Sequence, residues 1–150
     1  MKKGILSILL LFITNIIFAQ VATVSSPDGK LKLDIFLEEG QPKYSVEYDG
    51  KTALEKSPLG LLTNEGDFSK NLTFKEQTVE QVEKKYTQDK IKKSDIHYVA
   101  NKLTSSFEDE KQRGLSIVFQ VSNNDIAFRY ELPAWGERRA VVIEEEATGF

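Results

Sequence analysis

The chain has 150 residues, of which 40% are hydrophobic and 29% are charged, a balance typical of one folded domain. It contains no cysteine, which excludes disulfide bonds and thiolate metal sites. The formal net charge of −3 argues against nucleic acid or anionic lipid as a partner.

Residues 1–19 have the pattern of a secretory signal peptide. A basic start, Lys2-Lys3, precedes a largely apolar stretch, and Ala19 supplies the small residue expected at a cleavage site. The apolar run is short for a bilayer span, which needs about 20 residues, so a membrane anchor is the weaker interpretation. The sequence therefore predicts export to the periplasm, cleavage after Ala19 and no membrane span in the mature chain, 20–150.

Short strands with one apolar face dominate the first part of the mature chain. Residues 21–26 form the first, and Pro27-Asp28-Gly29 supplies a turn, because proline fixes φ and glycine accepts a positive φ. The next strand, 30–39, alternates and places four apolar side chains on one face: Leu31, Leu33, Ile35 and Leu37. We expect Gly40-Gln41-Pro42 to interrupt the chain after this strand.

A predicted hairpin follows this break. Residues 43–48 alternate again, Asp49-Gly50 is a strong hairpin signal, and residues 51–56 form the return strand. Several short antiparallel strands with one apolar face need a second layer to cover that face. The fold class predicted from these strands is therefore an all-β antiparallel sandwich.

The pattern becomes looser over residues 64–93, which are rich in Lys, Glu, Gln, Asp and Asn. Within them, residues 78–86 (TVEQVEKKY) allow an amphipathic helix, since Val79, Val82 and Tyr86 have helical spacing. The β-branched residues and the absence of a strong N-cap favour a strand instead. We interpret this segment as strand and loop, with the helix as the alternative.

Alternation resumes over residues 94–109 at Ile96, Tyr98 and Ala100, with Leu103 out of phase. Residues 114–122 predict a buried strand with Val118 on one face and four apolar residues on the other: Leu115, Ile117, Phe119 and Val121.

Asn123-Asn124-Asp125 predicts a turn, because Asn and Asp tolerate the left-handed region, and a strand over 126–133 completes a hairpin. A further strand is expected over 140–146. Residues 147–150 look like the entrance to further structure, since a finished domain usually closes with a docked element or a polar fringe. We therefore expect the sandwich to be incomplete.

Few side chains suggest chemistry. His97 is the only histidine, which excludes a cluster of histidine metal ligands, and its place in a strand favours a polar surface position over a catalytic one. Glu144-Glu145-Glu146 could attract calcium, but consecutive strand residues point to opposite faces and cannot converge on one ion.

The remaining candidates also have simple structural explanations. The residues Glu108, Asp109, Glu110, Lys111 and Arg113 suggest a charged hairpin loop. Glu131 precedes Pro133 at the expected end of an edge strand and has no evident partner carboxylate for general acid catalysis. Trp135 could stack on a sugar ring, although packing is the commoner role of a large aromatic residue. The sequon at Asn71 to Thr73 is a short motif that arises often by chance.

A resemblance extends over nearly the whole mature chain. The succession SPDGKLKL, PKYSVEYDGKTALEKSPLGL, IHYVANKL, LSIVFQVSNNDIAFRYELP and VIEEEATGF resembles the N-terminal domain of glycoside hydrolase family 97, with NDIAFRYELP the most specific part. The family comprises exported bacterial α-glucosidases and α-galactosidases.

This resemblance implies a galactose-mutarotase-like β-sandwich packed on a catalytic (β/α)8 barrel that binds an α-glucan or oligosaccharide. It also implies calcium near the active site of the full-length enzyme. No catalytic, substrate-binding or metal-ligating residue of the family can be carried onto this chain, so none is assigned, and no activity is expected from these residues alone.

Two rival hypotheses stay open from the sequence. The first is a free-standing periplasmic carbohydrate-binding module that uses Trp135 and exposed tyrosines as a stacking platform. The second is a structural β-sandwich with only a protein partner. Binding to soluble α-glucans would distinguish the first from the second.

Overall fold

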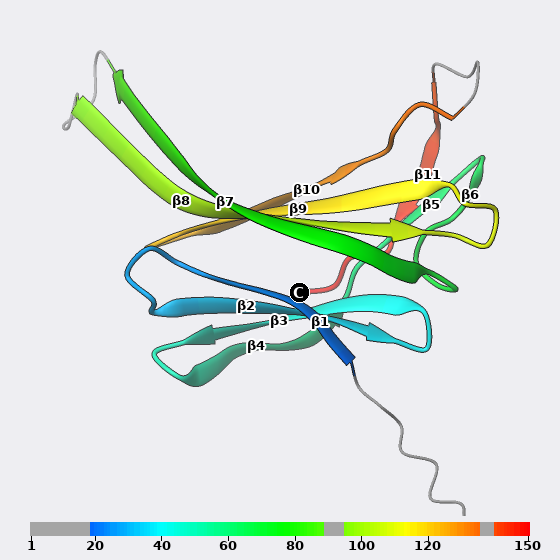
Figure 1. Cartoon of the computed structure of the whole chain (residues 1–150), viewed down its shortest axis with the longest axis horizontal. Coiled ribbons are helices and arrows are strands. Elements are labelled where there is room, and N and C mark those ends of the chain that lie inside the picture. Colours follow the sequence, from blue (N-terminus) through cyan, green and yellow to red (C-terminus); the bar gives the residue numbers. More distant parts are fainter. Residues whose placement is uncertain (1–18, 89–94, 136–139) are drawn as a thin grey trace, which may run out of the picture.

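The structure, a computed structural model, describes residues 19–88, 95–135 and 140–150. The predicted signal peptide lies outside these ranges except for Ala19. The described residues form strands β1 to β11 in three antiparallel sheets and no helix (Figure 1). No helix in these ranges is therefore long and apolar enough to cross a membrane. The predicted all-β antiparallel sandwich is confirmed.

The first large sheet has the order β1-β2-β3-β4. Its strands are β1 (Ala19–Ser25), β2 (Leu31–Glu38), β3 (Gln41–Tyr48) and β4 (Lys51–Pro58). The predicted Asp49-Gly50 hairpin is confirmed, and both residues have positive φ, 48° and 72°, as a tight two-residue hairpin turn requires.

The predicted break at Gly40-Gln41-Pro42 is wrong in its extent. The turn is formed by Glu39 and Gly40, with φ of 51° and 79°, and β3 begins directly after it. Pro42 lies inside the strand opposite Leu37, and its carbonyl accepts a hydrogen bond of 2.9 Å from the Leu59 backbone N–H. Proline is tolerated here because it lies near the start of the strand, where a missing N–H costs little.

The second large sheet has the order β10-β9-β8-β7. Its strands are β7 (Thr73–Thr87), β8 (Asp95–Glu108), β9 (Gly114–Ser122) and β10 (Ile126–Glu131). The helix alternative for residues 78–86 is therefore wrong, and the predicted β9–β10 hairpin is confirmed. The pattern of β7 was ambiguous because this edge strand is exposed along most of its length, so it needs few apolar residues.

A small third sheet has the order β11-β5-β6. It contains β5 (Leu61–Thr63), β6 (Gly66–Asp67) and β11 (Ile143–Glu146). The last strand was predicted, although it begins at Ile143 rather than at residue 140. The strands β5 and β6 were not predicted, because two or three residues are too few to show an alternating pattern.

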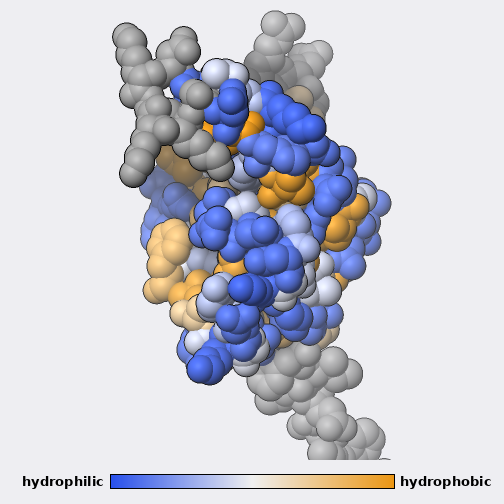
Figure 2. Space-filling view, turned by 90° about the vertical axis from the view of Figure 1, so that its left-hand side faces the viewer, coloured by the Kyte–Doolittle hydropathy of each residue, from blue (hydrophilic) through white to orange (hydrophobic). Residues whose placement is uncertain are grey.

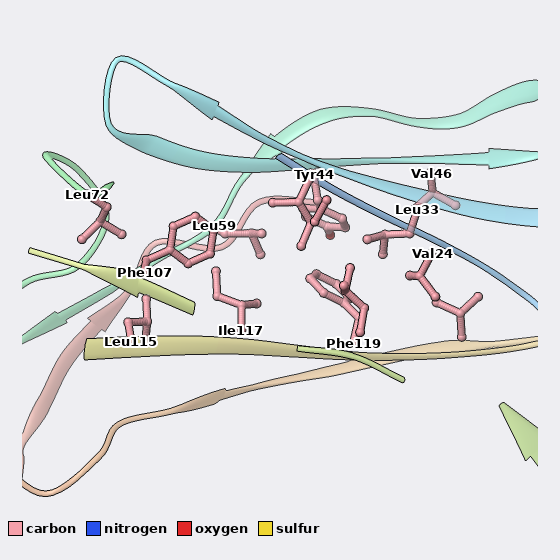
Figure 3. Packing of buried hydrophobic residues seen from close by; sticks show 14 of the residues in the cluster. Val24, Leu33, Tyr44, Val46, Leu59, Leu72, Phe107, Leu115, Ile117 and Phe119 are labelled. Atoms are coloured by element: carbon pink, nitrogen blue, oxygen red, sulfur yellow. The ribbon is translucent and has the colours of Figure 1, made fainter. Parts of the chain in front are cut away.

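The core lies between the two large sheets, whose inner side chains point toward one another (Figure 3). The predicted inner faces are confirmed, with Leu33 and Ile35 of β2 and Ile117 and Phe119 of β9 each 0% exposed. The position that was out of phase, Leu103, also faces this core. Because side chains alternate along β8, the positions Ile96, Tyr98 and Ala100 lie on the opposite face of the sheet.

The hairpin of β7 and β8 extends beyond the sandwich (Figure 1). The strand β9 pairs with β8 only from Ala100 onward, so residues 83–87 and 95–99 pair only with each other. We call these two segments the arm. At its base, the Asn101 side-chain amide donates a 2.7 Å hydrogen bond to the Ser25 carbonyl and ties the second large sheet to β1.

One buried polar group in the core gives a stability prediction. Ser105 of β8 is 0% exposed, and its hydroxyl has no hydrogen-bond partner among the described residues. A buried hydroxyl without a partner costs about 1–3 kcal/mol, so we expect Ser105→Ala to raise the free energy of unfolding by about 1 kcal/mol. Urea denaturation measures this change. A Ser106→Ala control should not be stabilising, because the Ser106 hydroxyl lies 3.2 Å from that of Ser116. A destabilised Ser105→Ala protein would contradict the prediction.

Candidate functional site

The turn between β8 and β9 carries the densest group of charged side chains predicted from the sequence. One Asp109 carboxylate oxygen accepts hydrogen bonds from the backbone N–H groups of Lys111 and Arg113, at 2.9 and 2.8 Å. The other oxygen accepts from the Arg113 guanidinium, with Nε at 2.8 Å. The charged hairpin loop is thus confirmed, and Asp109 closes it by bonding to its own turn.

Arg113 joins this turn to the small sheet. Its guanidinium donates to the Glu65 carbonyl and lies over the Phe68 ring, 5.6 Å from the ring centroid. It also lies 5.9 Å from the Trp135 ring centroid. Gly66 makes this approach possible, because a Cβ atom there would collide with the guanidinium. We call this group of five residues the corner: Phe68, Asp109, Arg113, Trp135 and Gly66.

Trp135 has a packing role in the corner. Its ring stacks on Phe68 with a centroid separation of 5.3 Å and an interplanar angle of 15°. It is partly buried against the hydrophobic core, and its indole N–H is buried without a hydrogen-bond partner among the described residues. One face of the ring is therefore already covered by Phe68, as the packing interpretation of the sequence predicted.

A pocket of about 150 Å³ next to the corner is lined by three carboxylates, Asp67, Asp109 and Glu110. Asp67 accepts hydrogen bonds from the Ser69 backbone N–H at 2.9 Å and from its hydroxyl, and forms an ion pair of 3.0 Å with Lys70. Burial raises the pKa of each aspartate carboxyl, but the hydrogen bonds from Ser69 and Arg113 outweigh it and hold both pKa values below normal. A general acid needs a raised pKa, so these two aspartates suit a structural role.

The Asp109 interactions predict how stability depends on pH. Because the pKa of Asp109 is lower in the folded chain than in the unfolded one, its contribution is complete above the unfolded pKa of about 3.9. It is lost as the pH falls through the folded pKa. We expect Asp109→Asn to reduce the difference in unfolding free energy between pH 7 and pH 3, measured by urea denaturation. Glu131→Gln is the control, because Glu131 is exposed, and an unchanged pH profile for Asp109→Asn would refute the role.

The other candidate residues are dispersed over the surface. His97 lies on the arm, where its Nε2 is 2.8 Å from a Glu83 carboxylate oxygen. Glu131 ends β10 and pairs with Arg129 at 2.7 Å. The acidic run 144–146 is exposed in β11, and no group of three possible metal ligands occurs in residues 19–88, 95–135 and 140–150. Asn71 of the sequon is exposed and has a φ of 55°.

The exposed tyrosines and Trp135 do not form one platform. Tyr86 is 45% exposed on the arm and Tyr48 is 47% exposed at the β3–β4 turn, whereas Trp135 belongs to the corner at the β5–β6 end. The arm and the small sheet lie at opposite ends of the molecule in Figure 1. The face seen from the arm side is mostly hydrophilic, with separate small hydrophobic patches (Figure 2).

Two tyrosines hold the C-terminal segment Ala147–Phe150 and were not predicted from the sequence. The Tyr44 hydroxyl donates to the Gly149 carbonyl at 3.1 Å. The Tyr130 hydroxyl accepts from the Gly60 backbone N–H at 2.8 Å and lies 2.6 Å from the Thr148 hydroxyl. Tyr44 and Gly149 are 105 residues apart in the chain, and no local pattern in a sequence indicates such a contact.

Comparison with known proteins decides the family. Residues 24–150 match the family described as glycosyl-hydrolase 97 N-terminal. The chain belongs to this family. It is therefore an N-terminal domain of the family 97 glycoside hydrolases, as the sequence resemblance predicted.

Solved structures and curated relatives agree with this assignment. A beta-arabinopyranosidase is 48% identical and has a TM-score of 0.82, over 86% of this chain and 21% of that protein. A family 97 enzyme from Pseudoalteromonas sp. strain K8, solved with panose, is 26% identical with a TM-score of 0.77, over 85% of this chain and 20% of that protein. A probable retaining alpha-galactosidase from Streptomyces bingchenggensis is 28% identical over 84% of this chain and 20% of that protein. The chain thus spans about a fifth of the length of each.

Proposed function

We propose that this family 97 domain is the non-catalytic N-terminal part of a longer exported glycoside hydrolase that cleaves α-glycosidic bonds. The observation that carries the proposal is the family match over residues 24–150. It is supported by the solved relatives, because this chain covers only about a fifth of the length of each. In this proposal the domain packs on the catalytic (β/α)8 barrel and shapes one side of the carbohydrate pocket. Residues 1–19 direct export to the periplasm.

The chemistry of the described residues supports a scaffold role. Asp67 and Asp109 are held as ionised carboxylates by neighbouring donors, and Glu131 and the acidic run 144–146 are exposed. Glycoside hydrolysis needs two carboxyl groups on either side of the scissile bond, one of them protonated. We therefore assign the catalytic pair to the remainder of the longer enzyme.

Residues 19–88, 95–135 and 140–150 offer no suitable site for calcium. The described residues contain no group of three possible ligands, and the half-buried carboxylates of Asp67 and Asp109 already accept hydrogen bonds from Ser69, Arg113 and the turn backbone. Calcium prefers six to eight oxygen ligands, several from carboxylates. These residues do not fit the ion, so we place any calcium ion of the full-length enzyme outside them.

The substrate class has two candidates. An α-glucoside or α-galactoside fits the panose complex and the probable alpha-galactosidase. A β-arabinopyranoside is the second candidate, because the beta-arabinopyranosidase shares 48% identity with this chain. A β-L-arabinopyranoside has the ring configuration of an α-D-galactoside but lacks its hydroxymethyl group. The arabinopyranoside and the α-galactoside therefore belong to one stereochemical class.

An activity assay tests the proposal. The purified 20–150 chain and the native protein from its host are incubated with aryl α-glucoside, α-galactoside and β-arabinopyranoside. We expect hydrolysis of one of these by the native protein and none above the buffer blank by the isolated chain. Turnover by the chain alone that is lost in Asp109→Asn or Glu131→Gln would contradict the proposal.

The free-standing carbohydrate-binding module remains the alternative function. Trp135 gives it little support, since one ring face is covered by Phe68 and the exposed tyrosines lie elsewhere. Binding of the isolated chain to soluble α-glucans, lost in Trp135→Ala, would favour the module over the scaffold.

A further inference from the structure

The two large sheets leave an opening along one side of the sandwich. β4 and β10 are edge strands, and the ring contact of 6.5 Å between Tyr44 of β3 and Phe128 of β10 places these edges on the same side. The opposite side is closed where β1 packs against β7 and β8. The C-terminus lies between the two layers (Figure 1). We call this opening the lateral seam and define it by Tyr44, Phe128, Tyr130 and Phe150.

The segment Ala147–Phe150 is fixed in an extended conformation along this seam. The Ala147 backbone N–H donates to the Gly60 carbonyl and the Gly149 N–H donates to the Pro58 carbonyl, both at 3.0 Å. The segment therefore pairs with the end of β4, and the sheet order gives it no strand neighbour on its other edge among the described residues. Gly149 is required for this approach, because a Cβ atom there would lie 2.8 Å from Pro58 Cδ.

Both large sheets hold the segment. Tyr44 comes from the first sheet and Tyr130 from the second, and their hydroxyls bond to Gly149 and Thr148. Thr148 and Phe150 are two residues apart in an extended segment, so they share a face, and that face is directed toward β10. The direction in which the polypeptide leaves the domain is thus set by contacts on both sides of the seam.

The seam carries an apolar surface that is continuous with the core. Phe119, which is 0% exposed, lies 5.5 Å from Phe128 between ring centroids, and Phe128 lies 6.4 Å from Phe150. Phe150 is nevertheless 86% exposed. Within the described part of the chain no strand pairs with the outer edge of β10, and such edges are normally paired or covered.

We propose that the lateral seam is closed by the polypeptide that directly follows Phe150 in the longer enzyme. This polypeptide covers Phe128 and Phe150 and pairs with the free edge of β10. The inference rests on the proposed function, because this chain covers only 20–21% of the solved relatives and their remaining length supplies the additional chain. A sugar is a poorer occupant, since the seam hydroxyls of Tyr44 and Tyr130 already bond within the domain.

Hydrogen exchange tests the seam in the native full-length protein. We expect the backbone amides of residues 126–131 to exchange about tenfold or more slowly there than in the 150-residue chain, because a paired edge is protected. Residues 114–122 of β9, which are paired on both sides, serve as the internal control and should exchange alike in both proteins. Equal exchange of residues 126–131 in the two proteins would overturn the proposal.

A variant of the full-length protein gives a second test. Phe150→Ser should speed exchange in residues 126–131, whereas Tyr86→Ser, which changes an exposed aromatic residue on the arm, should not. No effect of Phe150→Ser would overturn the proposal, as would a dimer of the 150-residue chain that protects the same amides, which would make a second copy the occupant. The mass of the native protein distinguishes a failure of the seam proposal from a failure of the proposed function. A native protein of only 150 residues would contradict both the proposed function and the seam proposal. A longer native protein in which residues 126–131 are not protected from exchange would contradict the seam proposal alone.

Discussion

Replacing Phe119 by alanine is expected to lower the free energy of unfolding by about 3–5 kcal/mol, the usual cost of removing a fully buried phenylalanine. Phe119 is 0% exposed at the centre of β9. Its ring lies 5.6 Å from Tyr44 and 5.5 Å from Phe128 between centroids, so it connects the two large sheets (Figure 3). The substitution removes these contacts and leaves a cavity that the surrounding strands can fill only in part.

Urea denaturation of the 150-residue chain measures this loss, and Phe150→Ala is the matched control. Phe150 is also a phenylalanine and is connected to the same aromatic cluster, but it is 86% exposed. Its truncation should therefore change the unfolding free energy of this chain by less than about 1 kcal/mol. Equal effects of the two substitutions would show that the buried aromatic cluster does not hold the sheets together.

Gly60→Ala is expected to destabilise the chain by about 3 kcal/mol or more, since it combines a strained backbone with overpacking. Gly60 has a φ of 149°, which side chains other than glycine rarely adopt. A Cβ atom there would lie 2.5 Å from Ser69 Cα and 2.9 Å from the Phe68 carbonyl oxygen. The change would also disturb the Gly60 N–H, which donates to the Tyr130 hydroxyl at 2.8 Å.

Gly29→Ala separates the two causes. Gly29 also has a positive φ, 75°, but a Cβ atom there would meet no other atom within 4 Å. Its substitution should cost only about 1–2 kcal/mol, the penalty of the left-handed region for a side chain. Thermal and urea denaturation of both variants check the difference, and a Gly60→Ala protein as stable as Gly29→Ala would refute the close packing of Gly60 against residues 68–69.

Much of the sandwich could be predicted because each large sheet has an apolar and a polar face. Alternation in residues 30–39 and 114–122 gave the inner residues of β2 and β9, and Asp49-Gly50 gave a hairpin. Where a strand is exposed on both faces, as in β7, alternation has no physical cause and the pattern became ambiguous. Pro42 was misjudged because a proline near a strand end breaks fewer hydrogen bonds than one in its centre.

The contacts of the candidate site were less predictable, because they join residues far apart in the chain. Trp135 could be expected to pack, but nothing near it indicated Phe68 as its partner. The bond between Asp109 and Arg113 is local, and their spacing in a charged turn was a usable signal. The hydroxyl of Tyr44 reaches Gly149 only because the fold brings β3 and the C-terminal segment together.

The mass of the native protein tests the central claim most directly. An antibody against residues 20–150 is used to detect the protein in extracts of its host. A band several times larger than the 17.0 kDa of this chain, in the fraction that hydrolyses the aryl glycoside, is the result that the proposed function predicts. A single band at or below 17.0 kDa would contradict it, since a protein of that size has no catalytic barrel.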